Sequence, residues 1–354
     1  MEAPSRFLRA LARQPVDCTP VWFHRQAGRY LPGYAAIARR LSFLEMCERP
    51  EVVAEVTLEP VEAHGVDAAI LFADILLVPR AMGIHLTIER EQGPIIETPI
   101  RSAEDIARLR EAGAEEELGF ISEAIALTRR ALAGRVPLIG FAGAPFTVAA
   151  YLIDGRISAE LPRTKVLMRR EPALWQELLT RLTTVTVRYL LAQVRAGAQV
   201  IELFDSWAGS LTRDEWERFA APFSRQIFQA LAEAGVPTIH FAGASNHLLE
   251  AMRQAGGDAI ALDWRVRLNS AWARIGYDRA VQGNLDPTVL LTPGAPLRAA
   301  IQDILDRAAG RPGHIFNLGH GVLRETSPAA VREAVALVHE LSARPPAQSE
   351  EEAG

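Results

Sequence analysis

Residues 200–209 read Val-Ile-Glu-Leu-Phe-Asp-Ser-Trp-Ala-Gly, a mainly apolar run that ends in polar and small residues. The run Val200–Phe204 predicts a buried strand of a parallel sheet. Amphipathic sequence with helical spacing stands on both sides of it, at Pro172–Arg195 and at Arg213–Ala234. Thr212 and Glu215 form a capping-box pattern, which predicts that the second helix begins between them. A strand flanked by helices is the repeating unit of α/β folds.

The same unit recurs along the chain, and eight strands are expected: Val21–Phe23, Ala68–Phe72, Pro137–Phe141, Val200–Phe204, Thr238–Phe241, Ala259–Leu262, Arg279–Gln282 and His314–Asn317. Further helices are expected at Pro50–His64, Ser122–Leu132, Asn246–Ala255, Pro296–Ala309 and Pro328–Leu341. Eight strands that alternate with helices predict a (β/α)8 TIM barrel, and 354 residues suit one such barrel with insertions. A doubly wound open sheet is the alternative. No Gly-x-Gly-x-x-Gly follows any predicted strand, which argues against its dinucleotide-binding version.

Two further features complete the predicted organisation. Leu86–Glu91 and Pro94–Ile100 alternate apolar and polar residues around Gln92-Gly93, which predicts a β-hairpin. We interpret it as an excursion near residues 85–100 on the rim of the barrel. From Arg344 onward the chain carries two prolines and then a run of glutamates, so residues 344–354 are expected to be a disordered tail. Residues 1–343 are therefore expected to form a single domain.

Composition excludes several classes of protein. The net charge is −5, which gives no general electrostatic footprint for nucleic acid or for an anionic membrane surface. No apolar run is long enough for a transmembrane helix, and the N-terminal residues lack the apolar core of a secretory signal. Cys18 and Cys47 are too few for a disulfide framework, so we expect a reducing, cytoplasmic location. Lys165 is the only lysine, which leaves little room for Schiff-base chemistry.

The residues after each predicted strand are the candidate site, because barrel enzymes place their chemistry at the carboxyl ends of the strands. Arg25 and Arg29 flank the small residues Ala27 and Gly28, and either grip a polyanionic ligand or form structural ion pairs. Asp74 follows an apolar strand, and it is either a buried helix cap or a functional carboxylate.

Three more polar residues lie near strand ends. His320 stands between two glycines after the last strand, and it is either a rim residue or a group that a bulky ligand approaches. Tyr151 and Ser206 either satisfy buried backbone groups or face a ligand. The histidines and cysteines form no zinc-binding pattern, so no metal site is expected.

Several motifs, in order, resemble those of the uroporphyrinogen decarboxylase family: Pro20-Val-Trp-Phe-His-Arg-Gln-Ala-Gly-Arg-Tyr-Leu-Pro32, Leu71-Phe-Ala-Asp-Ile-Leu76, Gly140-Phe-Ala-Gly-Ala-Pro-Phe-Thr147, Phe204-Asp-Ser-Trp-Ala-Gly209, Leu262-Asp-Trp264, Gln282-Gly-Asn-Leu-Asp-Pro287 and Phe316-Asn-Leu-Gly-His-Gly321. The resemblance covers roughly residues 15 to 340. It implies a (β/α)8 barrel that removes CO2 from the four acetate groups of uroporphyrinogen III, giving coproporphyrinogen III for haem biosynthesis.

The resemblance also implies the site. No metal or organic cofactor is expected, and the tetrapyrrole is the partner, bound by a homodimer. Asp74 matches the family's aspartate that accepts the pyrrole N–H bonds, and Arg25 is the candidate proton donor. The residues that match substrate-binding positions are Arg25, Gln26, Ala27, Gly28, Arg29, Asp74, Tyr151, Ser206 and His320.

The sequence departs from the family pattern at three positions. His24 stands where methionine is frequent, Ala38 where a further arginine is common, and Arg80 where an acidic residue or glutamine is common. Two rival functions are considered. Related corrinoid and coenzyme M methyltransferases share the barrel, but they need a His-x-Cys zinc set that Cys18 and Cys47 do not supply. The other rival is a non-catalytic tetrapyrrole carrier, against which Arg25, Arg29 and Asp74 argue.

Overall fold

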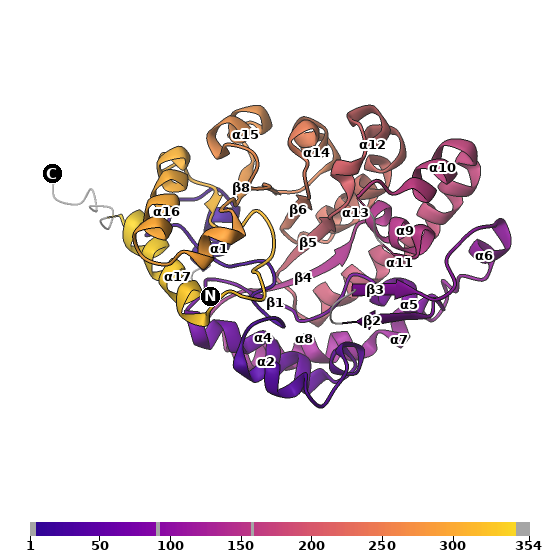
Figure 1. The fold of residues 1–354 in the computed structure, drawn as a ribbon, viewed down its shortest axis with the longest axis horizontal. Helices are drawn as coiled ribbons and strands as arrows, with labels where there is room; N and C mark the ends of the chain where they lie inside the picture. Colours follow the sequence, from indigo (N-terminus) through magenta and orange to yellow (C-terminus); the bar gives the residue numbers. More distant parts are fainter. Residues whose placement is uncertain (1–4, 90–92, 157–158, 345–354) are drawn as a thin grey trace.

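A curled parallel sheet of seven strands forms the centre of the protein, and helices lie around it (Figure 1). The computed structural model describes residues 5–89, 93–156 and 159–344. The strands follow one another in chain order: β1 (Ala69–Ile70), β4 (Leu138–Gly143), β5 (Val200–Asp205), β6 (Thr238–Ala242), β7 (Ala259–Ala261), β8 (Ala280–Gln282) and β9 (His314–Ile315). Every neighbouring pair is parallel, as the alternation of strands and helices requires.

The helices fall into two groups. One group consists of α4 (Pro50–His64), which precedes β1, and of helices that connect consecutive strands or follow the last one: α8 (Gly119–Leu132), α11 (Pro172–Ala196), α12 (Arg213–Phe219), α13 (Ala221–Glu233), α14 (Leu249–Ala255), α15 (Leu268–Ile275), α16 (Ala295–Ala308) and α17 (Pro328–Ser342). The other α-helices lie before α4 or in the segments that lead from β1 to β5: α1 (Arg6–Leu11), α2 (Pro32–Ile37), α3 (Phe43–Cys47), α5 (Leu77–Ala81), α6 (Ala103–Ala107), α7 (Ala114–Glu117), α9 (Pro145–Asp154) and α10 (Pro162–Arg170). Three 3₁₀ helices are η1 (Ala208–Ser210), η2 (Asn246–Leu248) and η3 (Pro287–Leu291).

The predicted helix Arg213–Ala234 is wrong as a single element, because it is divided into α12 and α13 at Ala220. The cause is Pro222, which has no N–H for the carbonyl one turn earlier and therefore starts a new helix. The predicted cap of α12 is confirmed, since Thr212 and Glu215 form a complete capping box. Likewise, the predicted helix Asn246–Ala255 begins as η2 and becomes an α-helix only at Leu249.

The first predicted strand, Val21–Phe23, is present only as a bridge between Val21 and Phe316. It ends early because the chain turns at Phe23, whose carbonyl accepts from the Gln26 N–H. The segment nevertheless has partners on both sides. On one side, Phe316 donates to the Pro20 carbonyl at 2.8 Å. On the other, Asp67, just before β1, donates its N–H to the Val21 carbonyl at 2.8 Å. Residues 20–22 thus lie between β9 and β1, the two edges of the sheet.

A buried polar network crosses the concave side of the sheet. Gln282 on β8 donates through Nε2 to Oε1 of Glu202 on β5 at 3.2 Å, although β6 and β7 separate these strands. His24 Nε2 lies 2.8 Å from the same oxygen, and both side chains are buried. Trp22 Nε1 donates to Gln282 Oε1 at 2.9 Å. Side chains of β5 and β8, which are not neighbouring strands, meet here. The sheet is therefore strongly curled, and its two edges approach each other.

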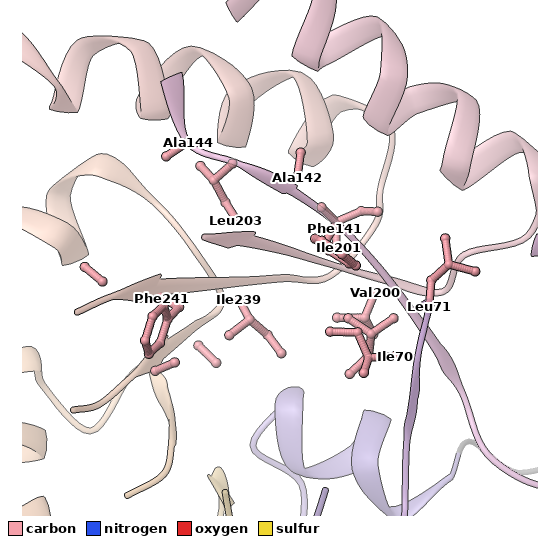
Figure 2. Close-up of a cluster of buried hydrophobic side chains, with 14 of the residues drawn as sticks. Ile70, Leu71, Phe141, Ala142, Ala144, Val200, Ile201, Leu203, Ile239 and Phe241 are labelled. Atoms are coloured by element: carbon pink, nitrogen blue, oxygen red, sulfur yellow. The ribbon is translucent and has the colours of Figure 1, made fainter. Parts of the chain in front are cut away.

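Apolar packing surrounds this network. Figure 2 shows side chains from β1, β4, β5 and β6 in contact, among them Ile70, Phe141, Val200 and Ile239. Phe204 lies edge-on to Phe141 and to Phe241, with ring centroids 5.4 and 5.7 Å apart. The parallel register brings these rings together, since Phe204 pairs with Phe241 on β6.

A second, antiparallel sheet of two strands consists of β2 (Leu86–Glu89) and β3 (Gly93–Ile96). Residues 90–92, which include Gln92 of the predicted Gln92-Gly93 turn, lie outside the described residues. The Ile96 and Ile100 N–H groups donate to the carbonyls of Gly155 and Leu152, so this segment packs beside α9.

The other predicted features of organisation involve the ends of the chain and the membrane. Residues 345–354 of the predicted tail lie outside the described residues, whereas Arg344 donates to the carbonyls of Asp17 and Gly310. Within the described ranges, no helix is both long and apolar enough to cross a membrane.

We predict that Asp67→Ala lowers the free energy of unfolding by about 2–4 kcal/mol, measured by chemical denaturation. The buried Asp67 carboxylate accepts from the Val21 N–H and Arg6 and contacts His339 Nε2, at 2.7–2.8 Å. The substitution leaves these groups without an acceptor and loosens residues 20–22. Asp17→Ala is the control, because Asp17 is an exposed partner of Arg6 and its loss should cost no more than about 1 kcal/mol. Equal losses would contradict a role of Asp67 in closing the sheet.

Candidate active site

The loop at residues 24–29 follows directly from the segment between β9 and β1. Its conformation is set by Gln26, which is fully buried. Gln26 Oε1 accepts from the Phe23 N–H, and Nε2 donates to the Ala68 carbonyl, both at 3.0 Å. Gln26 was predicted to bind substrate, but its side chain and its N–H are both bonded within the fold, and the whole residue is buried. Gly28 has a φ of 75°, and a Cβ there would overlap the ring of Phe72.

Arg25 and Arg29 lie beside the loop that follows β9. Arg29 donates through Nη1 to the Val322 carbonyl at 2.7 Å, and the Val322 N–H donates to the His24 carbonyl at 2.9 Å. The stem of Arg25 passes over Gly321, where a Cβ would stand 2.5 Å from Arg25 Cδ. Arg25 has a φ of 60°, an unusual conformation for a residue with a side chain. Its side chain is exposed and forms no hydrogen bond or ion pair with any described residue.

Asp74 lies in the loop between β1 and α5 and is partly buried. Its Oδ1 accepts from the Leu76 N–H at 2.8 Å, while no described residue donates to Oδ2. Burial raises the pKa of Asp74, and the Leu76 N–H and the charge of Arg25 oppose this rise. One oxygen therefore holds the turn into α5, and a functional role for Oδ2 stays a prediction.

Tyr151 and Ser206 come from α9 and from the end of β5. The Tyr151 ring lies edge-on to Trp207, with centroids 6.4 Å apart. The pKa of Tyr151 is raised by burial and by Asp74, and lowered by the Trp207 N–H and by Arg25. The Ser206 hydroxyl has no hydrogen-bond partner within the described part of the chain.

His320 follows β9 and has an exposed side chain. Its ring lies edge-on to Trp264, with centroids 6.2 Å apart, and Gly319 permits this because its Cα lies against the Trp264 backbone. Desolvation, followed by the charges of Arg25 and other neighbouring cations, lowers the pKa of His320. The imidazole is therefore neutral near pH 7, and it can donate and accept hydrogen bonds.

These residues form one electrostatic unit. Arg25 acts on the pKa of Asp74, Tyr151, Arg29 and His320, which come from four different segments of the chain. Burial, Arg25 and Arg324 lower the pKa of Arg29 to about 10, so Arg29 keeps its charge at neutral pH. The arrangement combines two cations for carboxylates with one carboxylate that can accept N–H donors.

A group that the sequence interpretation missed holds the end of β5. Asp205 is fully buried; its Oδ1 accepts from Thr147 Oγ1 at 2.8 Å and its Oδ2 from Trp216 Nε1 at 3.0 Å. Thr147 Oγ1 in turn accepts from the Trp207 N–H at 3.1 Å. Thr147 and Tyr151 are one turn apart on α9, so Asp205 links the tyrosine to the strand end. The available signal was position, because Asp205 and Trp207 flank Ser206.

The three residues that depart from the family pattern lie in three different environments. His24 belongs to the buried network with Glu202, below the loop that carries Arg25. Ala38 is buried in the hydrophobic core. Arg80 on α5 forms an ion pair with Glu48. Within residues 5–89, 93–156 and 159–344, no three histidine, cysteine or acidic side chains gather as a metal site.

Comparison with known proteins identifies the family. Residues 2–341 match the family model described as uroporphyrinogen decarboxylase (URO-D). The chain belongs to the uroporphyrinogen decarboxylase family. Two relatives described as uroporphyrinogen decarboxylase illustrate the similarity. The protein from Carboxydothermus hydrogenoformans is 50% identical over 336 residues, which is 95% of this chain and 96% of the relative. The protein from Roseiflexus is 51% identical over 344 residues, which is 96% of this chain and 99% of the relative.

Solved structures extend the likeness of this uroporphyrinogen decarboxylase family member to a wider fold. A methyltransferase from Methanosarcina mazei superposes with a TM-score of 0.81, at 21% identity, over 96% of this chain and 99% of that chain. A putative vitamin-B12-independent methionine synthase from Listeria monocytogenes gives 0.56 at 13% identity, over 91% and 98%. At these identities the likeness concerns the fold alone.

Asp205 supplies a pH-dependent prediction. Burial raises its pKa from 3.8 to about 6, so folding favours the protonated form. The resulting stability is present below pH 3.8 and is lost as the pH rises through 6. We therefore expect wild type to lose about 2 kcal/mol relative to Asp205→Asn between pH 4.5 and pH 7.5. Urea unfolding at several pH values measures this, and parallel curves for the two proteins would contradict it.

Proposed function

We propose that this protein is a carboxy-lyase of tetrapyrrole biosynthesis that converts uroporphyrinogen III into coproporphyrinogen III and CO2. Membership of the uroporphyrinogen decarboxylase family, with relatives about half identical over nearly the whole chain, is the observation that carries the proposal. Each of four acetate side chains loses CO2 and gains a proton, leaving a methyl group.

The substrate explains the combination of charges in the site. Uroporphyrinogen carries eight carboxylates on its periphery and four pyrrole N–H groups inside the ring. Arg25 and Arg29 supply cationic donors for carboxylates, and Arg25 has no competing partner among the described residues. Ser206, Tyr151 and His320 offer neutral donors, and the backbone of residues 26–28 lies between the arginines. Asp74 offers an acceptor for the pyrrole N–H groups through Oδ2.

Decarboxylation needs an acceptor for the electron pair of the cleaved C–C bond, which stays on the substrate when CO2 departs. Protonation of a pyrrole carbon turns the ring into a cation, which accepts that pair. Asp74, as the anion, stabilises this cation as it forms. The pyrrole N–H donors add to the Leu76 N–H and to Arg25, and together they oppose the effect of burial on the pKa of Asp74.

A proton must reach the ring, and another must reach the new methyl group. We propose that Arg25 directs this transfer, through water or a substrate carboxylate, because its exposed guanidinium is close enough to influence Asp74. Every step uses the substrate's own ring as the electron acceptor, so the proposed reaction requires no metal or organic cofactor.

Finer features of the protein belong to the same proposal. We propose a (β/α)8 barrel, in which residues 20–22 count as the eighth strand position because they bond to both sheet edges. Residues 1–343 form the single domain, with the hairpin as an excursion on its rim and residues 344–354 as a tail. A homodimer follows from the family resemblance. A reducing cytoplasm suits Cys18 and Cys47, which are both free and buried.

The decisive experiment incubates the purified, chelator-treated protein with uroporphyrinogen III without oxygen and follows coproporphyrinogen III by chromatography. Turnover that survives exhaustive chelation supports both the reaction and its independence of cofactors. Binding without turnover would mean that the protein is a tetrapyrrole carrier. Turnover that is lost on chelation and returns with one metal would contradict the cofactor-free mechanism.

Asp74→Asn should reduce turnover of uroporphyrinogen by about a hundredfold or more, the usual cost of losing one preorganised stabilising group. The amide keeps an oxygen for the Leu76 N–H, but it removes the charge and turns an NH2 group toward the pyrrole donors. Asp74→Glu keeps the charge and should retain part of the activity. Thermal melting checks the fold of both variants. Near-normal turnover by a folded Asn variant would leave Asp74 only its structural role in the turn.

Gly321→Ala should lower kcat/KM by tenfold or more, because its methyl group displaces the stem of Arg25, and small displacements of charged groups have large effects on rate. Gly119→Ala is the matched control, since a Cβ at Gly119 has no heavy atom within 4 Å. Steady-state kinetics and melting temperature are measured for both. If the two variants behave alike, the position of Arg25 does not govern the reaction.

A further inference from the structure

The indole of Trp207 has an unusual hydrogen-bonding state. Its Nε1 is buried and has no hydrogen-bond partner among the described residues. Four other tryptophans donate their Nε1–H to acceptors in the fold: Trp22 to Gln282 Oε1, Trp175 to the Phe219 carbonyl, Trp216 to Asp205 and Trp272 to the Arg279 carbonyl. A buried donor without an acceptor is costly, so such a group calls for a partner.

The position of Trp207 is fixed on both sides. Its N–H donates to Thr147 Oγ1 at 3.1 Å, and the Thr147 hydroxyl donates to the buried Asp205 at 2.8 Å. Its carbonyl accepts from the N–H and the hydroxyl of Ser210, at 3.0 and 2.8 Å. The backbone of the residue that carries the orphaned N–H is therefore held in place.

Trp207 stands among the residues of the proposed site. It directly follows Ser206, and its ring lies edge-on to Tyr151. The indole N–H is close enough to the Tyr151 oxygen to lower the pKa of that phenol, yet the two groups lack the geometry of a hydrogen bond. The Tyr151 hydroxyl and the Trp207 N–H are thus two donors side by side, neither of which has an acceptor in the described chain.

We propose that the Trp207 indole N–H donates a hydrogen bond to a carboxylate of the bound tetrapyrrole, next to Tyr151. This inference rests on the proposed function. An indole N–H can only donate, so its partner must be an acceptor, and carboxylates are the acceptors that the substrate carries. A neutral donor also contributes to carboxylate binding without the cost of burying another cation beside Arg25 and Arg29.

The test compares wild type with Trp207→Phe, which keeps an aromatic ring and removes the N–H donor together with the rest of the indole. We expect KM for uroporphyrinogen to rise by about tenfold to a hundredfold, as for a lost bond to a charged group. Both Trp207→Phe and Trp272→Phe lose the same part of the ring, so the melting temperature without substrate should fall less in Trp207→Phe, which breaks no hydrogen bond within the fold. Trp272→Phe is the control: it breaks a bond to the Arg279 carbonyl, so it should lower the melting temperature and leave KM unchanged.

Coproporphyrinogen, as a competitive inhibitor, identifies which carboxylate is bound, because its acetates have become methyl groups while its propionates remain. An inhibition constant that Trp207→Phe leaves unchanged supports contact with an acetate. One that rises in parallel with KM supports contact with a propionate.

Two results would overturn the inference. The first is an unchanged KM in Trp207→Phe. The second is a loss of melting temperature as large as that of Trp272→Phe, which would reveal an acceptor within the fold. Wild-type turnover separates these outcomes from failure of the proposed function. If wild type does not convert uroporphyrinogen, the proposed function is wrong. If wild type is active and Trp207→Phe has the same KM, only the proposed Trp207 contact is wrong.

Discussion

The hydrogen bonds of residues 20–22 to Phe316 and Asp67 hold the two edges of the sheet together, and the site depends on them. This segment leads directly into the loop with Arg25 and Arg29. Because it lies between β9 and β1, the loop comes to rest between His320, which follows β9, and Asp74, which follows β1. Groups almost 300 residues apart in the chain thereby become neighbours. Asp67 also contacts Arg6 on α1 and His339 on α17. Helices near both ends of the chain therefore stabilise the position of residues 20–22 between the sheet edges.

Buried side chains on the concave side of the curled sheet hold the start of the loop at residues 24–29 in place. Glu202, His24 and Gln282 form a buried polar network that spans the concave side. Glu202 Oε2 and His24 Nδ1 have no partner among the described residues, but the bonds that are formed restrict these side chains to one geometry. His24 is thus held by its imidazole, while its backbone bonds to Asn317 and Val322. The next residue, Arg25, takes up a left-handed conformation on this anchored base.

The proposed site divides its donors by charge. Arg25 and Arg29 form a cationic side beside the loop after β9, whereas Tyr151, Ser206 and Trp207 form a neutral side at β4 and β5. Asp74 lies within electrostatic reach of both Arg25 and Tyr151. A macrocycle with acidic substituents outside and N–H groups inside matches this division, because its rim meets donors and its centre meets an acceptor. Placing several neutral donors beside two arginines also limits the repulsion between neighbouring cations.

Local pattern alone determined the elements of this protein. The spacing of apolar residues predicted the positions of the seven strands of the parallel sheet. It also predicted α4, which begins at Pro50 and ends at His64 as expected. Both predictions succeed because strand and helix spacing are properties of short segments. Strand ends also indicated Arg25, Asp74 and His320. Tertiary structure decided their partners. Gln26 turned inward to bond the Ala68 carbonyl, and Asp205 became a buried acid linked to Thr147 and Trp216. The unpaired Trp207 N–H was equally invisible in the sequence. The hydrogen-bond partner of a buried polar group comes from a distant part of the chain, which reaches it only when the sheet closes. No local sequence pattern therefore identifies that partner.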